Sequence, residues 1–175
     1  KSAMPVIKLD KTLAGAILDI GGGGESVIGR LYGRQVTAVD KEPEEFDNLP
    51  EKCARVVADA RKLDFPDGKF DHVTMFYALM YMDEATRREV LAEAARVLRK
   101  GGLMHIWDME FDTYPAKVHL DIVLPGQNLH ADYEVHCSGR GVSLEQIRAF
   151  GDEAGLLLLM HRDNAGQISL CFQKP

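Results

Sequence analysis

Apolar and polar residues follow one another along the first two thirds of the chain in short runs that predict alternating strands and helices. The apolar runs typical of strands are 17–20, 35–39, 54–58, 70–77 and 103–107. Glycine, proline or aspartate lies beside each run, as expected at turns. Strands that alternate with helices in this way build a doubly wound parallel sheet, so we expect an α/β fold.

Two helices are expected between these strands. The first covers 26–32, and the second follows Asp83 as its N-cap and runs to Arg99. Apolar residues of the second helix recur on one face, and a glycine pair stops it. The segment 41–52 is polar and acidic, which predicts a loop or a short irregular helix.

The last part of the chain is expected to end the sheet with an antiparallel pair. Ser143 and Gln146 form a capping-box pattern that opens a helix to about Ala154. Apolar runs over 156–160 and 168–172 then flank a turn-forming segment and predict a hairpin. Together with the five strands above, they predict a mostly parallel seven-stranded sheet with an antiparallel C-terminal hairpin.

The segment 112–141 is expected to insert a second β-hairpin, because apolar and polar residues alternate on both sides of Pro125-Gly126. A register that pairs Val123 with Asn128 places complementary charges opposite one another at every polar position. The pairs predicted in this way are Asp121 with His130, His119 with Asp132, and Lys117 with Glu134.

Each face of this hairpin invites an interpretation. The polar face carries histidines and carboxylates of the kind that bind metals, but the charge-paired register explains them without a metal, and no metal site is predicted. The apolar face could form a lid over a ligand site, or it could pack on a second copy of the chain and make a homodimer.

Composition restricts the class of protein. The 175 residues and the formal net charge of −6 fit a single domain over 1–175 and argue against nucleic acid as a partner. No apolar run is long enough to span a membrane, and no signal peptide is recognised. Three scattered cysteines without metal-binding spacing favour a reducing compartment, so we expect a cytoplasmic protein.

Acidic residues and a glycine turn mark the expected ligand site. The strand over 17–20 contains Asp19 and leads into Gly21–Gly24, where a ligand can approach the main chain closely. Asp40 and Asp59 end the next two strands, and ligands of such sheets bind outside the carboxyl ends of the strands. The step from Asp19 to Asp40 is close to the spacing at which a carboxylate accepts from ribose hydroxyls.

In order and spacing, these motifs resemble those of the class I S-adenosylmethionine-dependent methyltransferases, in the small-molecule branch with domains of types 11 and 25. The resemblance covers about residues 16–107 and rests on the segments 17–25, 38–40, 57–60, 63–71 and 96–102. It implies a Rossmann-like methyltransferase fold, S-adenosylmethionine as cofactor and a small molecule as acceptor. The methyl group would pass by direct in-line transfer.

The resemblance also implies a role for each matched residue. Asp19 would face the methionine amino group, and Asp40 would bind the ribose diol. Asp59 would accept from the adenine amino group, while the backbone N–H of Ala60 meets a ring nitrogen. Glu25 stands where the family often has a third glycine, and we interpret it as an acid in the first turn of the next helix. The implied cofactor-binding residues are Asp19, Gly21, Gly22, Gly23, Asp40, Lys41, Asp59, Ala60 and Phe76.

No residue is singled out by spacing as the catalytic base. The candidates beside the strand ends are Tyr77, Tyr81, Asp108 and Glu110. Trp107 and Phe111 either line the acceptor pocket or simply pack.

Two alternatives to a methyltransferase remain open. A nicotinamide-dependent oxidoreductase would use the glycine turn and Asp40 equally well, but the turn lacks the last glycine of a dinucleotide fingerprint. A non-catalytic S-adenosylmethionine-binding subunit is the second alternative, because only about 15 residues precede the first strand, where relatives often place covering helices.

Overall fold

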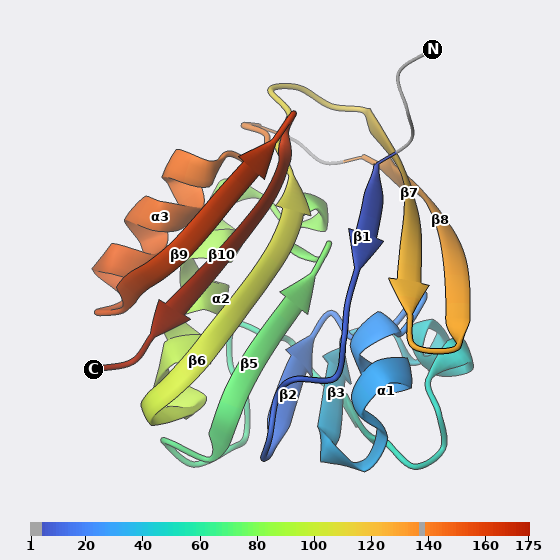
Figure 1. Cartoon of the computed structure of the whole chain (residues 1–175). Helices are drawn as coiled ribbons and strands as arrows, with labels where there is room; N and C mark the ends of the chain where they lie inside the picture. The colour runs from blue at the N-terminus through green and yellow to red at the C-terminus, as the bar shows by residue number, and fades with distance from the viewer. Residues whose placement is uncertain (1–4, 137–138) are drawn as a thin grey trace.

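The computed structural model describes residues 5–136 and 139–175 and shows a twisted seven-stranded sheet with helices on both faces (Figure 1). The strand order is β4-β3-β2-β5-β6-β10-β9, in which β2 to β6 are parallel and β10 is antiparallel to both its neighbours. This confirms the predicted fold class. The strands are β2 (Ile17–Ile20), β3 (Val36–Asp40), β4 (Ala54–Val57), β5 (Phe70–Phe76), β6 (Leu98–Met109), β9 (Leu157–Asn164) and β10 (Gln167–Gln173).

Helices α2 and α3 lie on one face of the sheet, and α1 lies on the other (Figure 1). Both predicted N-caps are confirmed, since Asp83 accepts from the backbone N–H of Thr86 (2.8 Å) and Ser143 from that of Gln146 (3.1 Å). No helix of the described residues is long and apolar enough to cross a membrane. The helices are α1 (Val27–Tyr32), α2 (Glu84–Val97) and α3 (Leu144–Glu153), with the 3₁₀ helices η1 (Gly33–Gln35), η2 (Pro43–Asn48) and η3 (Leu79–Tyr81).

Some element boundaries differ from the predictions. α2 stops at Val97 instead of Arg99, because Leu98 is already extended and pairs with Phe70 of β5. β6 therefore begins at Leu98, before the predicted start at residue 103. It also ends later than predicted, at Met109. The turn between β9 and β10 is only Ala165-Gly166, both at positive φ, a two-residue turn of the kind that matches the twist of antiparallel strands.

The inserted segment forms the hairpin of β7 (Ala116–Leu124) and β8 (Gln127–Val135), which builds a separate three-stranded sheet with the N-terminal strand β1 (Val6–Lys8). The predicted register is confirmed at every pair, including Val123 with Asn128. On the exposed face, Nδ1 of His130 lies 2.9 Å from Oδ1 of Asp121. The parallel pairing of β1 with β7 was outside the prediction, because a three-residue strand carries no periodic pattern.

The apolar face of this hairpin is buried in the core of the same chain. Leu120, Ile122 and Ala131 have no exposed surface, and Val118 is 3 % exposed. This face is therefore not available to a second copy of the chain, which corrects one of the two interpretations of the sequence. Its side chains instead join the main hydrophobic core.

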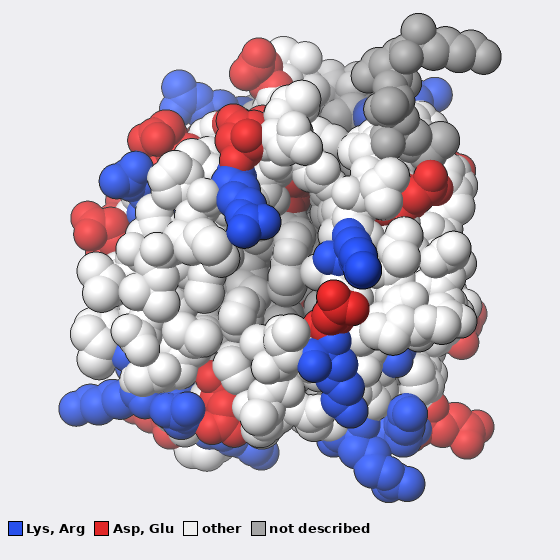
Figure 2. Space-filling view, viewed as in Figure 1, with Lys and Arg blue, Asp and Glu red and all other residues white. Residues whose placement is uncertain are grey.

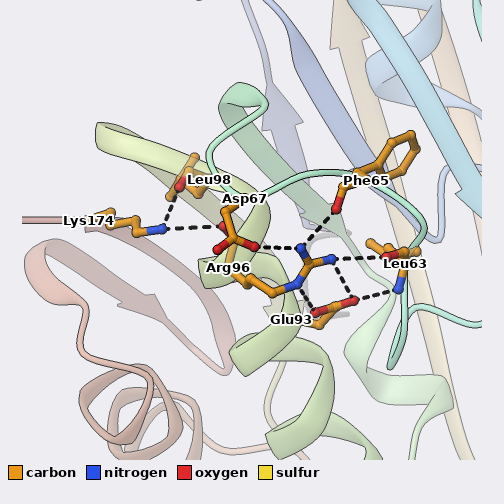
Figure 3. A network of polar contacts seen from close by, with 7 residues as sticks. All are labelled: Leu63, Phe65, Asp67, Glu93, Arg96, Leu98 and Lys174. Carbon is orange, nitrogen blue, oxygen red and sulfur yellow. Dashed lines mark hydrogen bonds and ion pairs between the residues drawn. The ribbon is translucent and has the colours of Figure 1, made fainter.

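Arg96, near the end of α2, joins that helix to the loop between β4 and β5 (Figure 3). Its guanidinium donates to the carbonyls of Leu63 (2.9 Å) and Phe65 (2.8 Å) and to the carboxylates of Asp67 and Glu93. Glu93 also accepts from the backbone N–H of Leu63. Two of the motif segments that carry the resemblance are thus bonded to each other, and they fix the chain that follows β4.

The face of the sheet over β6, β10 and β9 has no covering helix among the described elements, and it is largely uncharged (Figures 1 and 2). Trp107 and His105 are half-buried, with stacked rings 6.1 Å apart. Met160 of β9 is 53 % exposed. The ligand cavity of the molecule lies elsewhere, at the ends of the parallel strands.

Candidate functional site

A cavity of about 590 Å³ opens where β2, β3, β4 and β5 end, beside the β7–β8 hairpin. This volume is in the range of small-molecule sites. Every predicted cofactor-binding residue except Gly22 lines the cavity: Asp19, Gly21, Gly23, Asp40, Lys41, Asp59, Ala60 and Phe76.

The glycine turn between β2 and α1 borders the cavity on one side and packs against other parts of the chain on the other. Gly21 has φ 70°, a left-handed conformation that favours glycine. A Cβ at Gly23 would lie 2.3 Å from Cβ of Glu45, and one at Gly22 would lie 2.8 Å from Cβ of Ala38. The backbone N–H of Gly24 donates to the carbonyl of Glu45 (2.8 Å). Helix η2 therefore holds the turn, and close packing is one reason for the glycines.

Glu25 is not an acid of the first helical turn, contrary to the prediction. Ser26 is the N-cap at φ 52°, so α1 begins only at Val27 and Glu25 precedes the cap. Its carbonyl accepts from Nε of Arg30 (2.7 Å), and the residue lines the cavity. The left-handed turn at Ser26 delays the helix and leaves Glu25 beside the ligand space.

Asp19 is almost fully buried at the floor of the cavity. It is 2 % exposed, and its Oδ1 accepts from the hydroxyl of Thr74 (2.8 Å). Burial raises the pKa of Asp19 to about 7, and the nearby charge of Asp40 adds to the rise, while the Thr74 bond opposes it. A donor or a positive group in the cavity would favour the ionised carboxylate.

Asp40 and Asp59 lie at neighbouring strand ends but in different surroundings. Oδ1 of Asp40 accepts from the backbone N–H of Glu42 (3.2 Å). Both oxygens of Asp59 accept from Arg61, with 2.6 Å to Nη2 and 2.9 Å to the backbone N–H. These bonds lower the pKa of Asp59 to about 2. The Asp59 carboxylate is thus ionised and already engaged by a neighbouring guanidinium.

Three tyrosines form the opposite wall of the cavity. Tyr77 and Tyr81, both predicted candidates, line it together with Tyr133 of β8. Burial raises the pKa of Tyr77 and that of Tyr81 to about 12. Their phenols are therefore protonated at neutral pH and suited to donate hydrogen bonds.

The remaining candidates are not among the residues that line the cavity. Asp108 is fully buried, and its carboxylate accepts from the backbone N–H groups of Leu79 (3.1 Å) and Met109 (2.9 Å). Burial raises the pKa of Asp108 to about 7. Glu110 accepts from the backbone N–H of Leu144 (3.0 Å). Both carboxylates accept hydrogen bonds from backbone N–H groups and so have a structural role.

Trp107 and Phe111 pack instead of lining this cavity. The Trp107 ring lies 5.8 Å from that of Phe76, and the Phe111 ring meets that of Tyr114 edge-on at 5.0 Å. Of the two roles that the sequence allows for these residues, the ring contacts support packing.

The cavity is also lined by residues that the sequence did not assign to it, among them Arg61, Glu45 and Tyr133. The alternation of the hairpin places Tyr133 on the apolar face, which was a signal for its inward direction. Nothing in local spacing shows that this face meets the glycine turn. The hairpin therefore does contribute to the wall of the ligand cavity, as the lid interpretation proposes.

The site and fold agree with the comparison to protein families. A family model described as methyltransferase domain matches residues 18–106, which is just over half of the chain. The chain belongs to this methyltransferase domain family. This assignment supports the methyltransferase interpretation. It gives no support to a nicotinamide-dependent oxidoreductase.

Curated relatives of the methyltransferase domain include enzymes that act on different small molecules. The chain is 34 % identical to 27-O-demethylrifamycin SV methyltransferase of Amycolatopsis mediterranei over 157 residues, covering 80 % of this chain and 53 % of the relative. It is 32 % identical to the ubiquinone/menaquinone biosynthesis C-methyltransferase of Desulfotalea psychrophila over 142 residues, covering 76 % and 54 %. The chain thus spans about half the length of the curated relatives it matches.

Solved structures share the fold over a greater length. A SAM-dependent methyltransferase of Methanosarcina mazei aligns with a TM-score of 0.69 and 18 % identity, covering 93 % of this chain and 94 % of the other. At this identity the likeness concerns the fold alone.

Proposed function

We propose that residues 1–175 form a single methyltransferase domain that transfers the methyl group of S-adenosylmethionine directly to a small molecule. The observation that carries this proposal is the cavity at the strand ends of a methyltransferase family member, with three acids beside a glycine turn. A nucleoside with an amino-acid arm needs acceptors for its hydroxyl and amino groups and main chain that it can approach closely.

In this proposal the glycine turn and the acids at the strand ends hold the cofactor. Asp19 faces the methionine amino group, which would favour the ionised form of its carboxylate. Asp40 accepts from the ribose diol, with Lys41 beside it, and Gly21–Gly23 let the main chain pass close to the methionine portion. Phe76 borders the same portion from the end of β5. All of these except Gly22 line the cavity.

The adenine end needs one rearrangement. Asp59 is proposed to accept from the adenine amino group, next to the backbone N–H of Ala60. Because Arg61 occupies both oxygens of Asp59 in this structure, its exposed side chain would turn away or share them. Arg61 would then lie at the rim of the adenine site.

The proposed reaction requires little acid–base catalysis from the protein. When bound, S-adenosylmethionine supplies a methyl group that the sulfonium charge already activates. The residues of the chain then orient the acceptor and exclude water. Tyr77 and Tyr81, which keep their protons at neutral pH, would donate hydrogen bonds to the acceptor.

We further propose a small-molecule acceptor rather than nucleic acid, and a cytoplasmic location. The net charge of −6 opposes a phosphate backbone, and the cavity carries more carboxylates than basic groups. A homodimer through the hairpin would have to use its outer polar face or the open edge of β8, since the apolar face is buried.

Turnover separates an enzyme from a non-catalytic cofactor-binding subunit. The purified chain is incubated with S-adenosylmethionine labelled in its methyl group and with a panel of amines, phenols, thiols and carbon acids. Transfer of label to any acceptor supports the proposal. Tight cofactor binding without transfer to any member of a broad panel would favour the subunit.

A further inference from the structure

Three tyrosine rings from three different elements meet at the hairpin end of the cavity. Tyr77 follows β5, Tyr81 ends η3 and Tyr133 belongs to β8. The rings of Tyr77 and Tyr133 are nearly parallel, with centroids 5.9 Å apart and an interplanar angle of 13°. The ring of Tyr81 stands almost perpendicular to that of Tyr133, at 6.4 Å and 81°. The result is an aromatic corner that borders the ligand space.

Charges are distributed unevenly along the same cavity. Its two basic residues, Lys41 and Arg61, lie near Asp59, at the end proposed for the nucleoside. Two further lining carboxylates lie within electrostatic reach of the tyrosines: Glu25 near Tyr133, and Glu45, which lies between the glycine turn beside Asp40 and Tyr81. Neither of these carboxylates forms an ion pair with a basic side chain in the described part of the chain.

These carboxylates lie close enough to the rings to act on them. Glu25 raises the pKa of Tyr133, after the larger effect of burial, and Glu45 does the same for Tyr81. Asp132, which also lines this end, is paired with His119 and His130. The buried Asp108 acts on the pKa of all three tyrosines in the same direction, so carboxylates on several sides give the aromatic corner a negative potential.

We propose that the methyl acceptor is an amine, and that the aromatic corner of Tyr77, Tyr81 and Tyr133 with the carboxylates of Glu25 and Glu45 binds its cationic forms. This inference rests on the proposed function and names the substrate class of that site. Aromatic faces attract ammonium groups through the negative potential above the ring, most strongly where water is excluded. An anionic acceptor such as a carboxylate or phenolate would be repelled by the same wall.

The transfer step suits this wall because positive charge moves toward it. An acceptor bound as an ammonium first releases one proton to water. The lone pair of the resulting neutral amine forms the new N–C bond while the S–C bond of the sulfonium breaks, and the sulfur keeps that electron pair as a neutral thioether. The nitrogen becomes a methylated ammonium, which then releases one proton to water. Rings and carboxylates on the acceptor side stabilise the charge that develops there.

Probes that differ only in charge test this inference. The chain is saturated with S-adenosylhomocysteine and titrated with choline, with its neutral isostere 3,3-dimethyl-1-butanol and with 3,3-dimethylbutanoate. We expect choline to bind about tenfold more tightly than the neutral alcohol, and the anion to bind most weakly. Equal binding of choline and the alcohol, or tighter binding of the anion, would overturn the inference.

Two variants of one residue separate the ring from its hydroxyl. Tyr133→Phe keeps the ring, so the preference for choline should remain within about twofold, whereas Tyr133→Leu should remove most of it. A Tyr133→Leu variant that keeps the full preference contradicts the inference. If that variant no longer binds S-adenosylhomocysteine, Glu25→Gln replaces it: choline binding should then fall severalfold with binding of the alcohol unchanged, and unchanged choline binding counts against the inference.

The same titrations distinguish a failure of this inference from a failure of the proposed function. If the unaltered chain fails to bind S-adenosylhomocysteine, the proposed function fails. If it binds that ligand and shows no preference for the cation, only the amine inference fails.

Discussion

At the residue scale, the acids at the strand ends have different environments and therefore different properties. Asp19 is buried and accepts a hydrogen bond from Thr74, whereas Asp59 is exposed and accepts from Arg61. Burial raises the pKa of Asp19 to about 7, and hydrogen bonding lowers that of Asp59 to about 2. The same residue type at the carboxyl ends of two strands thus yields one carboxyl that titrates near neutral pH and one that is ionised at neutral pH.

Asp40 is the residue whose loss should weaken cofactor binding most directly. Asp40→Ala removes the carboxylate proposed to accept from the ribose hydroxyls, which should cost roughly 1–3 kcal/mol of binding free energy. Isothermal titration calorimetry with S-adenosylhomocysteine measures the change. Asp64→Ala, an exposed aspartate away from the cavity lining, is the matched control and should bind like the unaltered chain. Equal affinity of both variants for S-adenosylhomocysteine would show that Asp40 does not contribute to cofactor binding.

The buried carboxyl of Asp19 should make stability depend on pH. Burial raises the pKa of Asp19 to about 7 in the folded chain, from an ordinary value of 3.8. Between these values the folded state binds a proton that the unfolded state has released, so the contribution of Asp19 to stability falls as pH rises from about 4 to 7.

Asp19→Asn removes this titration while keeping an oxygen that can accept from Thr74. Relative to the unaltered chain, the variant should gain roughly 1–3 kcal/mol of unfolding free energy between pH 5 and pH 8. Urea unfolding at the two pH values measures the gain. Asp47→Asn, at an exposed position of η2, should show a constant difference. A constant difference for Asp19→Asn as well would contradict the shifted pKa.

At the element scale, one buried arginine connects the elements around the hairpin end of the cavity. Arg87 of α2 has no exposed surface, and its guanidinium donates to the carbonyls of Leu79 (3.0 Å), Arg140 (3.1 Å) and Gly141 (3.1 Å). It also donates to Oε1 of Gln146 (2.8 Å) and to the hydroxyl of Tyr114. These bonds tie η3, the two ends of the insert and α3 to one side chain.

Replacement of Arg87 should therefore destabilise the chain strongly. Arg87→Met leaves several buried acceptors without a donor, at a cost of about 3–5 kcal/mol in unfolding free energy. The next residue offers the control, because Arg88 is exposed and makes a surface ion pair with Glu153 and a cation–π contact with the ring of Phe150 (4.7 Å), so Arg88→Met should cost at most about 2 kcal/mol. Thermal and urea unfolding of both variants provides the comparison, and similar losses would argue against the central role of Arg87.

Elements whose signal is local could be predicted from the sequence, and those set by distant contacts could not. The register of β7 with β8 followed from charge pairs such as Asp121 with His130, because both strands lie close in the chain. β1 was missed, since its three residues are held only by pairing with β7. Glu25 was misplaced, because the left-handed backbone at Ser26 leaves no sequence pattern.

At the scale of the whole molecule, the β7–β8 hairpin completes a cavity that the main sheet begins. The strand ends provide Asp19, Asp40 and Asp59, all of which the sequence indicated through their order and spacing. The hairpin adds Tyr133, which lies far along the chain, and neither spacing nor composition predicts that it meets Tyr77. The end of the cavity proposed for the nucleoside was therefore predictable, whereas the end proposed for the acceptor required the tertiary structure.

Binding of S-adenosylhomocysteine tests the central claim most directly, because cofactor recognition by the cavity underlies every other proposal. Calorimetry and thermal unfolding should show saturable one-to-one binding with a rise in melting temperature. Nicotinamide dinucleotides should not compete, and Asp40→Ala should weaken the binding. Absence of heat and of any shift in melting temperature at millimolar ligand would contradict the account.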